Sequence, residues 1–109
     1  MANIDIEALV TEMGKAALPY LKAGAAKARE FGLHEADKMV RTAVMLAEGV
    51  AKGTIDEAEA KLILDVQRTA SRSVLLTIQG LGIVAVENAI NAAMAVLRQG
   101  IQIAIGVKL

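Results

Sequence analysis

The residues that could do chemistry form one small polar group inside a long apolar stretch. Between Arg72 and Arg98, the 24 residues 74–97 carry a single charge, at Glu87, and Asn88 and Asn91 follow it closely. A carboxylate that is taken out of water without a partner destabilises a fold strongly. The polar network of Glu87, Asn88 and Asn91 therefore faces water, meets an arginine such as Arg72 or Arg98 from another helix or chain, or lines a ligand or ion pathway. The pattern leaves these alternatives open.

A second chemical pattern is the segment GTIDEAE, residues 53–59, which resembles the second half of an EF-hand calcium loop. The first half does not fit, because Val50 and Lys52 stand where oxygen ligands are needed. We therefore interpret the segment as the start of a helix. Thr54 and Glu57 form a capping box, in which the hydroxyl and the carboxylate satisfy backbone donors of the first turn.

The inventory of catalytic groups is thin. His34 is the only histidine and the chain has no cysteine, so one chain lacks the residues for a histidine-based triad, a thiol nucleophile or a thiolate metal site. Gly80 and Gly82 lack the third glycine and the preceding strand of a dinucleotide-binding turn. We expect no catalytic residue, no metal, no cofactor and no small-molecule substrate, and hence no enzyme.

Charge and composition narrow the class of protein. Twelve basic residues balance twelve acidic ones without a basic cluster, so we expect no nucleic-acid partner. The N-terminal residues show no basic segment ahead of an apolar run, and we expect a cytoplasmic protein, with the membrane as the alternative. The chain has 21 alanines but only two aromatic residues among its 109, which favours an all-α fold over a β-sandwich or barrel.

Apolar residues recur every three or four positions, which predicts a single domain, residues 1–109, of three or four helices in antiparallel hairpins. Pro19 predicts a kink or break near Ala17 and Leu18. Gly32 and Gly53 are expected to end helices. At Gly80 to Gly82 the third helix could run on as one long helix, but we favour a kink or break there. The expected helices are residues 4–31, 34–52, 55–79 and 83–99.

The last nine residues, 101–109, alternate between apolar residues and smaller or polar ones, which is typical of a strand. A lone strand in a helical protein needs the edge of another chain. We therefore favour the alternative, in which this apolar end continues or follows the last helix and packs against it.

The stretch 74–97 is long enough to enter a bilayer, but the opposing contribution of Glu87 near its centre leaves the insertion free energy near zero. We favour a soluble homo-oligomer, a dimer or tetramer, with a structural or protein-interaction role. The tail is then exchanged or packed between chains. The alternative is a small membrane-active or membrane-inserted protein, similar to a holin, that uses residues 74–97. The expected oligomer interface consists of Leu75, Leu76, Ile78, Leu81, Ile83, Val86, Ile90 and Leu97.

Overall fold

The computed structural model describes residues 4–21, 25–78 and 80–109, and within these ranges the fold is all-helical with no strand. The predicted all-α class and the predicted number of helices are confirmed. The elements, in order, are α1 (Ile6–Ala17), the short 3₁₀ helix η1 (Leu18–Tyr20), α2 (Ala25–Lys52), α3 (Glu57–Leu76) and α4 (Ile83–Ile105).

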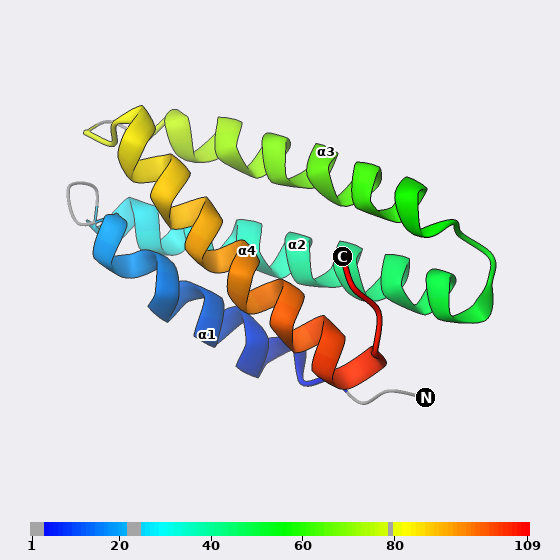
Figure 1. Ribbon diagram of the computed structural model, residues 1–109. Helices are drawn as coiled ribbons and strands as arrows, with labels where there is room; N and C mark the ends of the chain where they lie inside the picture. The colour runs from blue at the N-terminus through cyan, green and yellow to red at the C-terminus, as the bar shows by residue number, and fades with distance from the viewer. Residues whose placement is uncertain (1–3, 22–24, 79) are drawn as a thin grey trace.

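The four helices pack in two thin layers. Figure 1 shows α3 and α1 at opposite edges of the bundle, with α4 crossing between them in front of α2. The most extensive contacts join α1 to α4 and α2 to α3. The molecule measures 43 × 24 × 16 Å, and its thinnest dimension leaves room for only two layers of helices. Each helix therefore keeps one side turned outward.

The break after α1 follows the proline prediction. The Asp5 carboxylate begins α1 by accepting the Ala8 backbone N–H at 3.0 Å, as an N-cap aspartate does. The helix ends at Ala17, and Pro19 lies in the first turn of η1, where its missing N–H is tolerated. The predicted break near Ala17 and Leu18 is confirmed.

The predicted helix end at Gly32 is wrong, because α2 begins at Ala25 and continues through Gly32 without a break. The expected boundary between helices 4–31 and 34–52 is therefore wrong, whereas the expected end at residue 52 is confirmed. A glycine in a helix interior destabilises the helix by about 1 kcal/mol, and packing of the helix against its neighbours readily offsets that amount. Ala28 and Ala36, on either side of Gly32, are both buried in the core.

The link between α2 and α3 is a tight turn. Gly53 has φ +78° and ends α2, as predicted. The capping box predicted at Thr54 is wrong: the Thr54 hydroxyl donates to the Gly49 carbonyl at 3.1 Å, and the residue before α3 is Asp56. The Thr54 side chain therefore caps the C-terminal end of α2 and not the N-terminal end of α3.

The apolar stretch 74–97 is divided between two helices. Its first residues complete α3, which ends at Leu76, and α4 begins at Ile83. The predicted break near Gly80 to Gly82 is confirmed, and Gly80 adopts φ +92°. Within the described ranges, no helix has the length and hydropathy needed to cross a membrane.

Helix α4 runs to Ile105, beyond the predicted end at residue 99. Gly106, with φ +81°, caps it by donating its N–H to the Gln102 carbonyl at 2.9 Å. Val107 is buried and Leu109 half-buried against the core. The strand interpretation of residues 101–109 is thus wrong, and the favoured alternative, an end that continues the last helix and packs, is confirmed.

Candidate interaction surface

Most of the expected oligomer interface lies inside this chain. Five of its eight residues are at most 6% exposed, and they are Leu75, Ile78, Val86, Ile90 and Leu97. The physical reason is the position of α4, which contacts α1, α2 and α3 together. Side chains that already fill the chain's own core cannot line a contact with a second chain while this fold persists.

The other three expected interface residues lie near the turn between α3 and α4. Leu76 and Leu81 are half-buried, and Ile83 is 63% exposed at the first position of α4. Val84 beside it is 73% exposed. Of the expected surface, only this end of α4 is open to a partner.

The polar network is joined to α3 by two arginines. Arg68 donates through Nη2 to Asn91 Oδ1 at 2.7 Å and to Glu87 Oε2 at 3.3 Å, and Arg72 donates through Nε to Glu87 Oε1. Arg72 was one of the two partners considered from the sequence, whereas Arg68 was missed. Its position four residues before Arg72, on the same side of α3, was the signal. Asn88 is exposed.

These contacts hold Glu87 in its charged form. The pKa of Glu87 lies below its ordinary value, chiefly because Arg72 donates a hydrogen bond to the carboxylate. Desolvation opposes this shift, and the charge of Arg72 and the hydrogen bond and charge of Arg68 support it. The group is a clamp between α3 and α4, with each carboxylate oxygen bound to a different arginine.

A second polar contact, between Glu35 and Ser71, joins α2 to α3 and was not expected. Glu35 is 2% exposed and Ser71 is fully buried. The Ser71 hydroxyl donates to Glu35 Oε1 at 3.0 Å, and Lys38 Nζ donates to Oε2 at 3.0 Å. Gln67 donates in turn to the Ser71 hydroxyl at 3.2 Å. The signal was Ser71 itself, seven residues after the buried Leu64 on the apolar stripe of α3.

An apolar cavity of ≈230 Å³ lies between α1, α2 and α4 and includes Met13, Met39 and Ile90 in its lining. Its lining also includes the polar residues Thr11, Lys15, Arg29 and Glu35. Both oxygens of the Glu35 carboxylate are bound, by Ser71 and Lys38. Among the described side chains no cluster of three potential metal ligands occurs.

The outward side of α3 carries no charged residue over three turns. We call it the α3 outer face, and its residues, all exposed, are Leu62, Ile63, Val66, Thr69, Ala70 and Ser73. Leu62 and Val66 are each 65% exposed, although both are large and apolar. The opposite side of the helix contributes Leu64, Ser71 and Leu75 to the core. Because α3 lies at one edge of the bundle, nothing in the described chain covers this face (Figure 1).

Comparison with known proteins gives no relative from which a role could be inferred: no protein-family model, no curated protein and no solved structure matches this chain.

Proposed function

We propose that this protein is a non-enzymatic helical protein that associates with itself and has a structural or protein-interaction role. The observation that carries the proposal is the α3 outer face, because Leu62 and Val66 are exposed on a helix side without charge. Fully burying a side chain of this size contributes about 1.5–3 kcal/mol. Contiguous apolar surface on a small protein is typical of an interaction site.

The contact surface that we propose is the α3 outer face, whereas the sequence favoured the apolar stretch 74–97. Five of the interface residues expected from the sequence serve the core of the chain itself, whereas the α3 outer face is free for a partner. A dimer is the simplest assembly that covers one such face on every chain, and it is the commonest form of homo-oligomer. We propose that the protein acts in the cytoplasm, which is compatible with its balanced charge and its lack of cysteine.

Light scattering during size-exclusion chromatography tests the proposal in detergent-free buffer over a range of concentrations. We expect the mass of a dimer or tetramer, decreasing on dilution. Leu62→Asp combined with Val66→Asp should give a monomer whose far-ultraviolet circular dichroism remains helical. Met45→Asp is the matched control, because Met45 is 61% exposed on α2, and it should leave the assembly intact. A wild-type chain that stays monomeric at several hundred micromolar would contradict the proposal.

A membrane-active role is the second candidate, and one observation favours it. Ile83 and Val84, neighbours at the start of α4, are 63% and 73% exposed, and neither is used by the α3 outer face. Liposome flotation separates the two candidates. Binding to anionic vesicles that is lost in Ile83→Ser with Val84→Ser would support membrane action. Recovery of all the protein in the soluble fraction would contradict membrane action, and self-association would then be the remaining candidate.

A further inference from the structure

We infer that the partner of the α3 outer face is the same face of a second copy, with the two α3 helices antiparallel across a twofold axis. The inference rests on the proposed self-association and specifies its geometry. Leu62, Val66, Thr69 and Ser73 follow one another at steps of four, three and four residues. This spacing is that of the contact positions in a two-helix coiled coil. These four residues lie on the side of α3 opposite to the core, so they take no part in the packing that folds the chain.

We call Leu62, Val66, Thr69 and Ser73 the seam. In an antiparallel pair Leu62 meets the partner's Ser73, and Val66 meets the partner's Thr69, so the four layers have similar volumes. The Ser73 hydroxyl already donates to the Thr69 carbonyl of its own helix at 3.1 Å. It can therefore enter an interface without leaving its donor unsatisfied.

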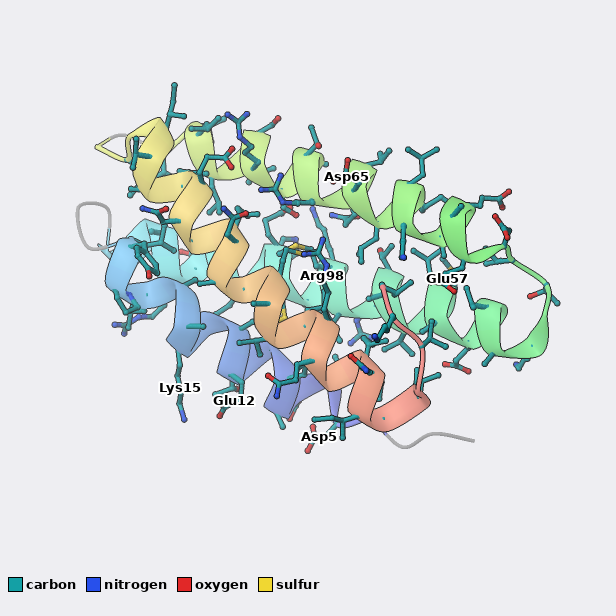
Figure 2. All side chains as sticks on the ribbon, viewed as in Figure 1. Asp5, Glu12, Lys15, Glu57, Asp65 and Arg98 are labelled. Atoms are coloured by element: carbon teal, nitrogen blue, oxygen red, sulfur yellow. The ribbon has the colours of Figure 1, made fainter. Side chains whose placement is uncertain are left out.

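The charges that flank the seam select the antiparallel direction. In this register Asp65 faces the partner's Arg72, and the twofold axis repeats the pair, giving two equivalent ion pairs. Asp65 is exposed and forms no ion pair within the described chain. Arg72 binds Glu87 through Nε, and a guanidinium has further N–H donors for a second carboxylate. Figure 2 shows Asp65 on α3, at the edge of the bundle opposite to Glu12 and Lys15 on α1.

On the second flank of the antiparallel seam, Ile63 faces the partner's Ala70, which extends the apolar contact. The parallel arrangement does not pair the charges of Asp65 and Arg72. In a parallel pair in register, Asp65 would instead face the partner's Ala70, and Arg72 would face the partner's Thr77. The sequence of α3 is therefore complementary to itself in one direction only.

The size of the seam sets the strength of the dimer. From Leu62 to Ser73 it extends about 17 Å along the helix. A contact of this length between two helices buries less than the roughly 1,200 Å² that specific, stable interfaces reach. We therefore expect a reversible dimer with a Kd on the order of micromolar.

Disulfide mapping tests the register, since the chain contains no cysteine of its own. Val66→Cys and Thr69→Cys chains are prepared separately, mixed as folded proteins and oxidised mildly. A disulfide needs Cα atoms within about 7 Å of each other. We expect the mixed dimer to form at least about five times faster than either homodimer, because residues 66 and 69 of different chains face each other.

Two results would overturn the register. One is Val66→Cys alone cross-linking as fast as the mixture, which a parallel pair would give. The other is an oligomer by light scattering without any 66–69 cross-link, which would place the contact elsewhere and leave the proposed self-association standing. A wild-type monomer at all concentrations would overturn both.

Charge reversal provides an independent test by sedimentation equilibrium. Asp65→Arg places two arginines opposite each other at both ends of the seam, and we expect the Kd to rise at least about tenfold. Glu30→Arg, an equal charge change at an exposed position on α2, should leave the Kd unchanged. An Asp65→Arg dimer as tight as the wild type would contradict the pairing with Arg72.

Discussion

The hydroxyl of Ser71 on α3 donates a hydrogen bond of 3.0 Å to the carboxylate of Glu35 on α2, and neither side chain reaches water. Lys38 binds the second oxygen from the half-exposed side of α2. The carboxylate thus has one neutral partner in the core and one cation at its edge. This contact fixes how far α3 is shifted along α2, because an apolar stripe alone would permit neighbouring registers.

Ser71→Ala should destabilise the protein by about 1–3 kcal/mol, because a buried carboxylate oxygen loses its donor. Thr11→Ala is the control, on a helix outside the seam. Thr11 is exposed on α1 and its hydroxyl donates to the Glu7 carbonyl of its own helix, so we expect a change within about 0.5 kcal/mol. Urea unfolding followed by circular dichroism measures both. Equal effects would show that the bond to Glu35 adds nothing to stability.

Glu87 should make stability depend on pH in the acidic range. The pKa of Glu87 lies below its ordinary value because of Arg72, and such a carboxyl adds stability above its unfolded pKa, near 4.3. That stability is lost as the pH falls through the lower folded pKa. We expect wild type to be more stable than Glu87→Gln at neutral pH, and the difference to shrink below about pH 4.

The control for this experiment is Glu30→Gln, which removes an exposed carboxylate of α2 that has no ion pair in the described ranges. Its difference from wild type should stay flat from neutral pH to pH 3. Chemical unfolding at a series of pH values provides the comparison. A pH-independent gap between wild type and Glu87→Gln would contradict the role of the arginine clamp.

Two glycines in close contacts should respond differently to alanine. Gly49 is buried near the end of α2, and a Cβ there would lie 2.5 Å and 2.8 Å from Ile55 Cδ1 and Cγ1. We expect Gly49→Ala to destabilise by about 1–3 kcal/mol through overpacking. At Gly100 the nearest atom is the end of the Leu9 side chain, which can rotate away. Gly100→Ala should therefore change stability by less than about 1 kcal/mol, because helix propensity offsets the contact. Thermal unfolding would contradict this account if the order were reversed.

Gly32 and Gly53 form a second pair of opposite expectations. Gly32 lies inside α2, and the nearest atom to an added Cβ is 3.8 Å away, so Gly32→Ala should stabilise by up to about 1 kcal/mol. Gly53 has φ +78°, and Gly53→Ala should destabilise by about 1 kcal/mol. Melting temperatures of the two variants decide the matter. If Gly32→Ala lowered the melting temperature, Gly32 would act as the helix end that the sequence suggested.

The spacing of apolar residues was sufficient to predict an all-helical chain, and Pro19 and Gly53 were sufficient to predict two of the breaks. Gly32 was misleading because a glycine only weakens a helix, and whether the helix continues depends on the packing of distant residues such as Leu21. Thr54 was misleading because its hydroxyl has two possible backbone partners, and the turn geometry selects the Gly49 carbonyl.

The site was harder to predict than the fold, since it depends on which side of each helix is covered. From the sequence, Leu75 and Ile90 were as suitable for an interface as Leu62, because all three are large and apolar. Only the position of α4 across α2 decides that Leu75 and Ile90 are buried and Leu62 is exposed. Leu62, Val66 and Ala70 recur at the spacing that is typical of the buried side of a helix, so the sequence alone does not show which apolar side of α3 faces the core.

The contact between α1 and α4 joins the two helices that are farthest apart in the sequence. Synthesis proceeds from the N-terminus, so α1 leaves the ribosome well before α4 exists. During that interval Met13, which is fully buried in the finished fold, has no α4 to pack against. The hairpin of α2 and α3 needs only neighbouring segments and can form first, because local contacts require less loop closure. The nascent chain therefore exposes the apolar side of α1 until its last helix is complete, which is the stage at which a chaperone would bind it.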